Sequence, residues 1–294
     1  TQRPTASART TAPRCGATEP LVIDQGGVLA WGAPQLRDLP WRSERDPWAI
    51  LVAEVMLQQT QADRVIPKWR AFLAAYPQPI DCASASLADV LRLWQGLGYP
   101  RRARNLRTTA ELVGDRHGGR LPDDLDALLA LPGIGPYTAR AVLAFAFERD
   151  VGVVDTNIAR VLARTTGERL SPKRAQAIAD AVVPQHHGWI WNQVMMDLGA
   201  ILCRPAPACA DCPLAATCAW HLGGHPDPDP SVGSAGVSTP QAPFDGSARQ
   251  ARGRLLAALH DGARPVGEFD AGVVATLVAD GLVEVREDFV SLPT

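Results

Sequence analysis

The sequence predicts a mainly α-helical protein that ends in a small α/β module. Between residues 21 and 202, apolar residues recur at helical spacing, and the alternation of apolar and polar residues that marks strands is absent. Glycine and proline residues separate the apolar runs, which indicates many short helices joined by tight turns. Short β-type runs follow only after residue 243, behind two further helical stretches.

The composition of the 294 residues is that of a folded chain, with 46% hydrophobic and 20% charged residues, and the length suffices for two or three domains. The net charge of −2 gives no global signal for nucleic acid, so any nucleic-acid surface must be local. No run of 18 apolar residues occurs, so we expect no membrane span. We also recognise no signal peptide.

The chain begins with a segment that we expect to be a disordered tail, at residues 1–20. It is rich in Thr, Ala, Arg and Pro. An Arg-rich start with few acids also fits a transit peptide, but no clear amphipathic helix is visible there. The helical domain follows at 21–202, and its apolar runs predict successive helices.

Residues 48–61 place an acid inside an apolar helix. Glu54 lies one turn after Ile50 and Leu51. Apolar neighbours disfavour a charged carboxylate, so the pKa of Glu54 should be raised, and an acid still protonated near neutral pH can act as a general acid. The alternative is that Glu54 points to solvent. The polar residues 58–61 end the helix with amides that suit base edges or phosphates, or that simply form an exposed terminus.

A glycine-rich turn, LPGIG, stands at residues 131–135. Glycine adopts backbone angles closed to other residues, so we expect a tight turn that opens a helical hairpin at 131–142. The free N–H groups of the following helix suit a phosphate. Asp155 follows further along, after three valines. A carboxylate one helix away from a phosphate clamp suggests chemistry on a nucleic acid backbone or sugar; the alternative is an N-cap aspartate in a plain helical hairpin.

Four of the six cysteines crowd into one loop, which we place at residues 203–222. They are Cys203, Cys209, Cys212 and Cys218. Such clustering without a signal peptide indicates metal ligation and not disulfides. Four thiolates in one short loop suit an iron–sulfur cube, whereas structural zinc usually draws on two separated pairs. Cys15 and Cys82 fit no such pattern and are expected to be free thiols.

The last part of the chain is expected to be a linker followed by a module. Residues 223–243 are rich in Pro, Gly, Ser and Asp, which is a linker composition. Residues 244–294 predict a winged-helix-like module, with an irregular capping subdomain as the alternative. Its expected helices are at 247–260 and 271–280, and its expected hairpin strands are at 282–285 and 289–292. Three arginines start the first helix and could reach phosphates: Arg249, Arg252 and Arg254.

The motifs of the helical domain resemble one superfamily. The glycine turn with its following aspartate resembles the helix-hairpin-helix DNA glycosylases, which include endonuclease III. Residues 54–61, EVMLQQTQ, resemble the signature of the MutY-type adenine DNA glycosylases within it. Residues 39–42 and 94–106 resemble further motifs of the same family. The resemblance spans roughly residues 36–218.

The resemblance implies a helix-hairpin-helix DNA glycosylase fold with a [4Fe–4S] cluster in the cysteine loop, where the first cysteine gap is one residue shorter than in the superfamily. It implies that adenine mispaired with 8-oxoguanine or guanine in double-stranded DNA is flipped out and its N-glycosidic bond hydrolysed, in base excision repair. We expect a cytoplasmic monomer, associated with the nucleoid of a bacterium. The alternatives are a mismatch-specific thymine or uracil glycosylase, and a DNA-binding protein without catalysis.

The resemblance also implies roles for individual residues. Glu54 would protonate the adenine ring, Asp155 would stabilise the oxocarbenium-like sugar, and Asn157 would help orient the acid site. Tyr137 stands where bifunctional relatives carry a sugar-attacking lysine, so we expect a monofunctional enzyme. The remaining DNA- and base-binding candidates are Trp41 and Arg42 for the adenine pocket, Gln59 and Tyr99 as wedges in the stack, Gly133 and Gly135 as a phosphate clamp, and Leu57, Gln58 and Thr60 of the signature.

Two further features bear on DNA binding. Pro100 stands where the family often carries a second tyrosine, next to Tyr99. The short C-terminal module is too small for the larger Nudix-like domain of longer relatives. We therefore expect the lesion to be read chiefly by Gln59 and Tyr99, or by a different use of the small module. A local basic cluster is either a phosphate-contacting face or a solvated helix surface. Its members are Arg101, Arg102, Arg104 and Arg107.

Overall fold

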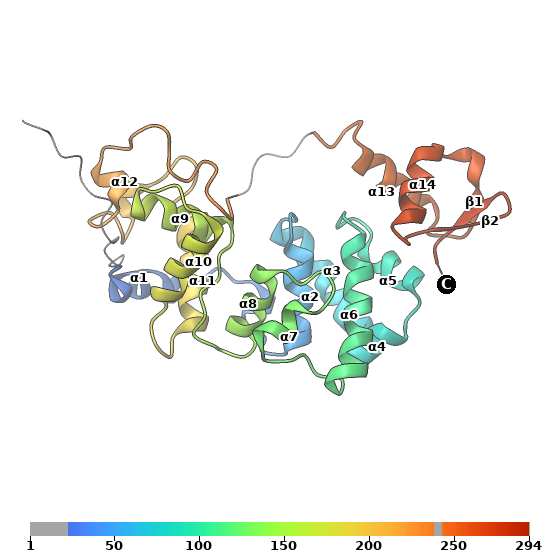
Figure 1. Ribbon diagram of the computed structural model, residues 1–294, viewed down its shortest axis with the longest axis horizontal. Helices are drawn as coiled ribbons and strands as arrows, with labels where there is room; N and C mark the ends of the chain where they lie inside the picture. Colours follow the sequence, from blue (N-terminus) through green and yellow to red (C-terminus); the bar gives the residue numbers. More distant parts are fainter. Residues whose placement is uncertain (1–22, 238–242, 294) are drawn as a thin grey trace, which may run out of the picture.

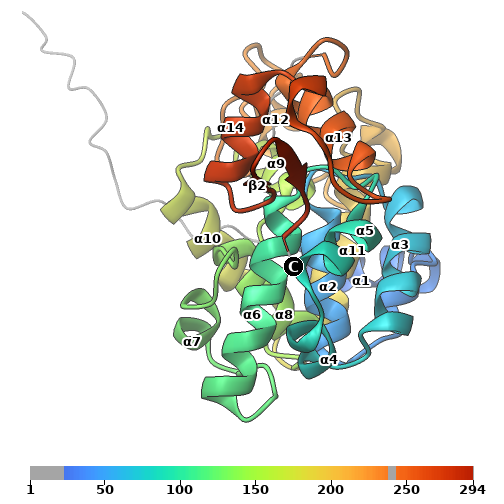
Figure 2. The ribbon, with the colours of Figure 1, turned by 90° about the vertical axis from the view of Figure 1, so that its right-hand side faces the viewer.

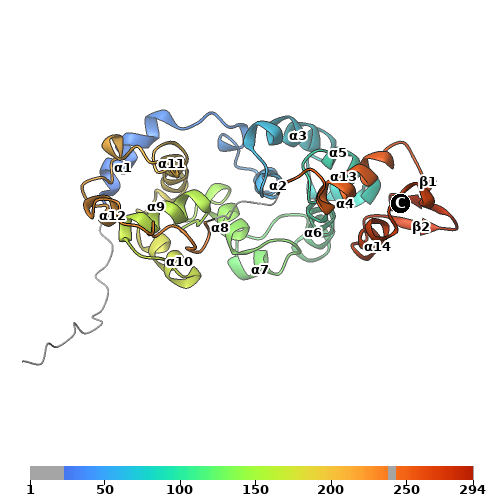
Figure 3. The same ribbon diagram turned by 90° about the horizontal axis from the view of Figure 1, so that it is seen from above.

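The computed structural model of the chain describes residues 23–237 and 243–293. Its helices form two groups that lie side by side, and the C-terminal module lies above the second group (Figure 1). Seen from above, α8 (Pro136–Phe145) lies between the two groups (Figure 3), and it packs against α2 of one and α11 of the other. The predicted fold class, mainly α with a small α/β module, is confirmed.

The second group is continuous in sequence, whereas the first is assembled from distant parts of the chain. The second group contains α2 (Pro47–Leu57), α3 (Ala62–Ala75), α4 (Pro79–Ser84), α5 (Leu87–Trp94), α6 (Arg101–His117) and α7 (Leu125–Leu129). The first group contains α1 (Gln25–Gly32), α9 (Thr156–Thr166), α10 (Pro172–Ala181), α11 (Gly188–Ile201) and α12 (Ala219–Leu222). Single 3₁₀ turns occur at η1 (Ala33–Gln35), η2 (Pro40–Arg42) and η3 (Cys209–Asp211).

Local sequence fixes where the helix with Glu54 begins. Asp46 accepts the N–H of Ala49 with its side chain, and Pro47 occupies the first position of α2. An acidic N-cap followed by proline is a strong start signal. The rotation of α2 about its axis, and hence the direction of Glu54, is set by this start and by the apolar residues around it.

Each group of helices has its own hydrophobic core. In the second group, α2 is buried almost all round, and the rings of Trp48, Phe72 and Trp94 pack edge to face or tilted against one another. The core of the first group includes Val28, Ile158, Leu162, Trp191 and Leu198. The chain passes from one core to the other at Val153 and Val154. Asp155, the next residue, therefore lies at their junction.

The C-terminal module has one strand more than predicted. Its elements are α13 (Ala248–Ala258), β1 (Arg264–Pro265), the 3₁₀ turn η4 (Val266–Glu268), α14 (Ala271–Ala279), β2 (Glu284–Arg286) and β3 (Phe289–Ser291). The strands are antiparallel in the order β1-β3-β2, with Val290 opposite both Arg264 and Val285. The two helices and the hairpin were predicted; β1 is too short, and too rich in proline, to be recognised from its sequence.

Residues 223–237 of the predicted linker 223–243 make specific contacts with the helical domain. Residues 223–237 pack against α9 and the loop after it: Asp229 forms an ion pair with Arg164, and Ser234 accepts the N–H of Leu170. Proline and glycine are common in irregular packed loops as well as in spacers, so composition could not distinguish the two. The predicted tail at 1–20, with Cys15, lies outside the described residues. No helix in the described part of the chain is long and apolar enough to cross a membrane.

Candidate active site

Glu54 is buried at the interface between α2 and α8, with 4% of its surface exposed. Its Oε2 accepts a hydrogen bond from the Tyr137 hydroxyl at 2.7 Å. Burial raises the pKa of Glu54 to about 7; the bond from Tyr137 lowers this pKa, and the charge of Asp155 raises it. The alternative that Glu54 points to solvent is therefore wrong, and this carboxyl group keeps its proton up to neutral pH.

Asp155 is the N-cap of α9. Its Oδ1 accepts the backbone N–H groups of Ile158 at 2.7 Å and Asn157 at 3.0 Å, and its Oδ2 accepts the side-chain amide of Asn157 at 2.8 Å. Desolvation by burial raises the pKa of Asp155, and these N–H donors lower it. The two interpretations of Asp155, as a capping residue and as a functional carboxylate, are compatible, because the capping bonds fix the carboxylate in place.

The amide of Asn157 is itself held in one orientation. Arg160 donates from Nη2 to Oδ1 of Asn157 at 3.0 Å, so the amide nitrogen faces Asp155. The same guanidinium bonds the carbonyl oxygens of Gly199 and Cys203. Arg160 thus connects the start of α9 to the beginning of the cysteine loop.

The two carboxyl groups differ in how many donors they receive. Glu54 accepts one hydroxyl, whereas Asp155 accepts three N–H groups. Donors stabilise the ionised form, so the three N–H groups oppose the rise in the pKa of Asp155 that burial causes. The junction of the two helix groups then holds a carboxylic acid beside a carboxylate, which is the arrangement that divides acid and base roles between two like residues.

The predicted turn at 131–135 joins α7 to α8. Gly133 has a φ of 76°, and a Cβ on it would lie 2.9 Å from the amide nitrogen of Asn105, so both the backbone angle and the space require glycine. Gly135 is the N-cap of α8, and a Cβ there would meet no atom within 4 Å. Thr109 on α6 donates to the carbonyl oxygen of Pro132 at 3.0 Å and braces the turn. The turn therefore presents backbone to solvent.

Gln59 and Tyr99, the predicted wedge residues, share an uncommon backbone conformation. Their φ angles are 58° and 48°, in the left-handed region that residues other than glycine seldom occupy. Both side chains are exposed, with 37% of the Tyr99 surface accessible. Such strained positions persist only where the surroundings enforce them, and they gather at functional sites. Insertion of these residues into DNA stays a prediction.

Arg102 supplies this enforcement. Its Nη1 donates to the carbonyl oxygens at the end of α2, and its Nη2 donates to those of the loop before Tyr99. The acceptors are Val55, Met56, Gln58, Leu97 and Gly98. Its guanidinium also lies 5.5 Å from the Tyr99 ring centroid. One side chain on α6 thus clamps both wedge loops together.

The four arginines of the predicted basic cluster on α6 all make contacts within the protein, although the Arg101 side chain stays 65% exposed, and contact with phosphates stays a prediction. Arg102 acts as the clamp just described, and Arg107 bonds the carbonyl oxygen of Ala85 and pairs with Glu111. Arg101 and Arg104 bond Asp280 of the C-terminal module. The sequence showed the charge but not its partners, because all of those partners except Glu111 lie outside α6.

Trp41 and Arg42, predicted for the adenine pocket, are both buried. Trp41 packs edge-on against Trp69 with centroids 6.0 Å apart. Arg42 makes a two-pronged ion pair with Asp197 on α11, at 2.7 and 2.8 Å. Asp197 also pairs with Arg37, and these arginines lower its pKa against the effect of burial. The structure thus assigns Arg42 a bridging role between the helix groups, and its part in a base pocket stays a prediction.

The other signature residues lie around the end of α2. Leu57 and Gln58 are half-buried, and the amide of Gln58 donates to the hydroxyl of Thr138 on α8 at 3.3 Å. Thr60 bonds the carbonyl oxygen of Leu97 in the Tyr99 loop. A cavity of about 430 Å³ lies beside these residues and the glycine turn, lined among others by Gln58 and Gly133. Glu54 is not among its lining residues.

The four cysteines of the loop surround one cavity of about 370 Å³. Among the described residues, the only candidate ligand atoms that gather within 4.8 Å belong to Cys209, His221 and His225, so no three cysteine sulfurs are that close together. A tetrahedral zinc ion with bonds of about 2.3 Å would need its sulfurs about 3.8 Å apart. A [4Fe–4S] cube separates its thiolates further, because each binds a different iron. Four cysteines around one cavity are the donor set that a [4Fe–4S] cluster takes, so the residues fit this group.

Charge around the cysteine loop supports thiolate ligands. Arg164, almost fully buried, places Nη1 3.5 Å from Sγ of Cys203 and stacks on Trp220 at 4.4 Å. It also pairs with Asp229. A buried cation beside thiolates offsets part of their negative charge. The roles of Arg164, Arg102 and Asp197 could not be recognised in the sequence. Each is one of many charged residues, and only the fold shows its partners.

Comparison with known proteins agrees with this geometry. Residues 52–185 match the family described as HhH-GPD superfamily base excision DNA repair protein. The chain is 40% identical over 293 residues to the adenine DNA glycosylase of Mycobacterium tuberculosis, covering 92% of this chain and 93% of that one. The agreement thus includes the C-terminal module.

Solved structures match the helical part. A thermostable thymine-DNA glycosylase superposes with a TM-score of 0.65 at 31% identity, covering 68% of this chain and 95% of that one. A non-covalent complex of endonuclease III with DNA gives 0.60 at 25% identity, covering 68% and 94%. Both neighbours leave about a third of this chain unmatched.

Proposed function

The chain belongs to the adenine DNA glycosylases of the HhH-GPD superfamily of base excision DNA repair proteins, and from this premise we propose that it removes adenine paired with 8-oxoguanine or guanine in double-stranded DNA, by hydrolysis of the N-glycosidic bond. The observation that carries the proposal is the protonated, buried Glu54 beside the hydrogen-bonded Asp155. An acid that reaches the base and a carboxylate that faces the sugar are what this cleavage requires.

Glu54 supplies the proton. A base inside a duplex cannot reach a buried acid, so the adenine must first be extruded from the stack. Glu54 then protonates a ring nitrogen, and the base leaves as a neutral molecule. The Tyr137 hydroxyl holds the carboxyl group at one oxygen, Oε2, and so directs the other toward the base.

Asp155 stabilises the sugar. Positive charge grows on the sugar ring as the bond to adenine lengthens, and an ionised carboxylate in a water-poor site opposes it strongly. The N–H donors from Asn157 and Ile158 keep Asp155 ionised and fixed, so little reorganisation is needed during the reaction.

Hydrolysis without strand cleavage follows from the choice of residue at position 137. A bifunctional enzyme needs an amine to form a Schiff base, and a tyrosine hydroxyl cannot form one. The two lysines of the chain lie elsewhere: Lys68 on α3 and Lys173 on α10. Water therefore completes the reaction and leaves an abasic site in an intact strand.

Cys203, Cys209, Cys212 and Cys218 would hold the [4Fe–4S] cluster. When bound, the cluster would hold the four thiolates together and so fix the loop between α11 and α12. An iron assay of anaerobically purified protein should give about four irons per chain, and one zinc without iron would contradict the cluster.

The glycine turn would hold a phosphate of the DNA through its backbone N–H groups.

The test of the activity is an excision assay on four duplexes, with A:8-oxoguanine, A:G, T:G and U:G pairs. We expect excision of adenine only, with strands that break after alkali treatment. Glu54→Gln and Asp155→Asn should each slow single-turnover excision by about 10²-fold or more while DNA binding persists; asparagine still caps a helix, so Asp155→Asn should fold. The matched control is Glu168→Gln, an exposed glutamate after α9. Excision of thymine, or wild-type rates for both variants, would contradict the proposal.

A further inference from the structure

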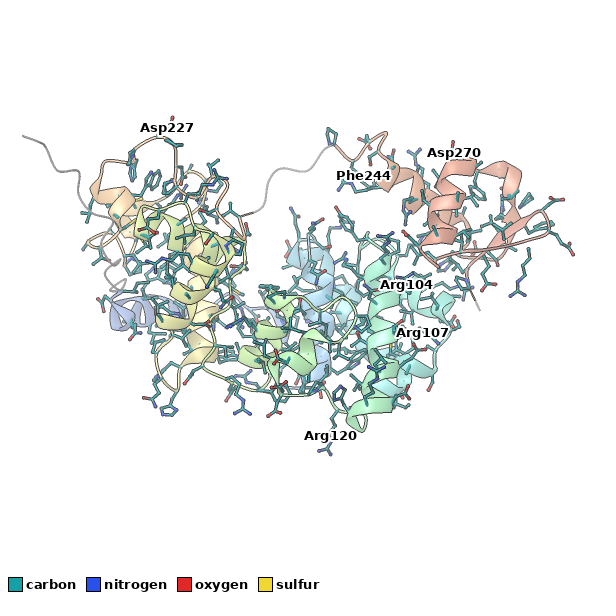
Figure 4. The ribbon with its side chains drawn as sticks, viewed as in Figure 1. Arg104, Arg107, Arg120, Asp227, Phe244 and Asp270 are labelled. Carbon is teal, nitrogen blue, oxygen red and sulfur yellow. The ribbon has the colours of Figure 1, made fainter. Side chains whose placement is uncertain are left out.

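The C-terminal module is docked on the catalytic helices by a buried carboxylate. Asp280, at the end of α14, is 5% exposed. Arg101 of α6 and Arg252 of α13 donate to its carboxylate, and Arg104 of α6 donates to its carbonyl oxygen. Figure 4 labels Arg104 at the end of α6 nearest the module. Loss of an arginine would leave the buried negative charge of Asp280 with fewer donors, so these contacts favour one orientation of the module.

Apolar contacts continue across the same interface. Buried residues of the module, among them Leu255, Leu277 and Val290, belong to the same hydrophobic core as α2, α5 and α6. At the edges, Ala88 donates to the carbonyl oxygen of Pro293 at 3.1 Å, and Arg92 donates to that of His260. Figure 2 shows the module above α5 and α6. The module is thus part of the folded enzyme and not a separate unit on a tether.

This docking brings the first turn of α13 to the Tyr99 wedge. Arg249 donates from Nη1 to the Tyr99 hydroxyl at 3.1 Å. The helix is placed by its N-cap Ser247, which accepts the N–H of Gln250, and the Arg249 guanidinium lies 5.9 Å from the centroid of Phe244. Tyr99 is therefore contacted from two sides: by Arg102 at its ring and by Arg249 at its hydroxyl.

Open space lies beside the Tyr99 loop at this interface. A cavity of about 490 Å³ runs along the interface beside the wedge loop, lined by Gly98 and Pro100 on one side and by Gly253 and Leu256 on the other. The hydrogen bond from Arg249 to the exposed Tyr99 hydroxyl is directional, so it restricts the rotation of that side chain.

We propose that Arg249 of the C-terminal module is a positioning residue that orients Tyr99 for insertion into the DNA stack. The inference rests on the proposed function, since it gives the module a role in mispair selection by that activity. It replaces the expectation that Arg249 and Arg252 reach phosphates: Arg252 is bound to Asp280, and Arg249 to Tyr99.

The test is a double-mutant cycle with Arg249→Ala and Tyr99→Phe, at one fixed salt concentration. The readout is the ratio of single-turnover excision efficiency on A:8-oxoguanine to that on A:G. Each variant should lower this ratio about threefold to tenfold, the size expected for one hydrogen bond, and the double variant should lower it no further. Arg249→Lys, which keeps a donor, should restore part of the ratio.

The matched control is Arg254→Ala, an exposed arginine on the same helix. Loss of a general charge should change the affinity for both duplexes by the same factor and leave the ratio unaltered. Binding is measured in parallel for the same variants on the Glu54→Gln background, with 2-aminopurine beside the mispair to report unstacking of the DNA. This series separates the hypothesis about Arg249 from the proposed excision activity. If the enzyme fails to excise adenine, the proposed function fails, yet this series still tests Arg249. Uniform weakening by Arg249→Ala, like that of Arg254→Ala, or fully additive effects in the cycle, would overturn the inference.

Discussion

Replacing Tyr137 by phenylalanine should shift the pH dependence of excision to higher pH. The Tyr137 hydroxyl is the only side-chain donor to the Glu54 carboxyl group within the described residues, at 2.7 Å. A donor favours the ionised form of an acid, so this bond lowers a pKa that burial has raised to about 7. Without the hydroxyl, the pKa of Glu54 must rise further.

The size of the shift follows from the strength of that bond. A hydrogen bond to a charged group contributes about 1.5–3 kcal/mol. One pH unit corresponds to about 1.4 kcal/mol, so the bond is equivalent to about one to two pH units. The protonated acid can also bind the hydroxyl, which reduces the difference between the two forms. We therefore expect a shift of about one unit.

The assay is single-turnover excision from an A:8-oxoguanine duplex between pH 5 and 9.5. The wild-type rate should decline as pH rises through about 7, because the general acid is lost as Glu54 ionises. In Tyr137→Phe the same decline should begin about one unit higher. Tyr76→Phe, a change at a buried tyrosine in the core around α2, is the control and should leave the midpoint in place. An unshifted midpoint, or one moved to lower pH, would refute the assignment of Glu54 as the titrating acid.

Three further outcomes are expected. First, the pKa of Glu54 in the folded protein, about 7, exceeds its reference value of 4.5, so the folded protein loses stability as pH rises between these values. Glutamine does not ionise, so Glu54→Gln removes this loss. In urea titrations, the change that Glu54→Gln makes in the free energy of unfolding should be about 3 kcal/mol more favourable at pH 8.5 than at pH 4. An equal effect at both pH values would contradict the burial argument. Second, Arg102→Met should lower stability by about 3 kcal/mol and reduce affinity for mispaired duplex, since it leaves several buried carbonyl oxygens without a donor; circular dichroism and binding titrations check this, with exposed Arg120→Met as control. Third, borohydride should trap little covalent DNA complex, and strong trapping would show that Tyr137 is not the residue that decides monofunctional behaviour.

The sequence was sufficient to predict the helical architecture and the burial of Glu54. The apolar run around Glu54 already implied burial, because a charged side chain with apolar neighbours on both sides has no solvent to face. Asp155 was harder, since an N-cap aspartate and a functional aspartate look alike in sequence. The structure resolves this because the capping bonds are themselves the means by which the carboxylate is fixed.

What the sequence could not show is which distant groups meet. Arg102 was recognised only as one member of a basic cluster, because its carbonyl acceptors come from the end of α2 and from the loop before Tyr99. Asp197 carried no signal at all, although it joins Arg42 to α11. The segment at 223–237 has the composition of a flexible spacer, yet it is packed. Asp229 pairs with Arg164 on α9, and Ser234 accepts the N–H of Leu170 in the loop after α9.

The division of the helices into a continuous and a discontinuous group has a consequence during synthesis on the ribosome. Helices α2 to α8 can pack as soon as residue 145 has emerged, whereas the segment after α1 must wait for α11: Arg37 and its partner Asp197 are 160 positions apart. After residue 145 a further 56 residues must emerge before α11 is complete at residue 201, which at 5–20 residues per second takes about three to eleven seconds. During that time α2 and α8 can already bring Glu54 and Tyr137 together, whereas the helix group that holds Asp155 is incomplete. The nascent chain therefore has its acid before its carboxylate. The site is complete only when the group of α9 to α11 packs against the group of α2 to α7.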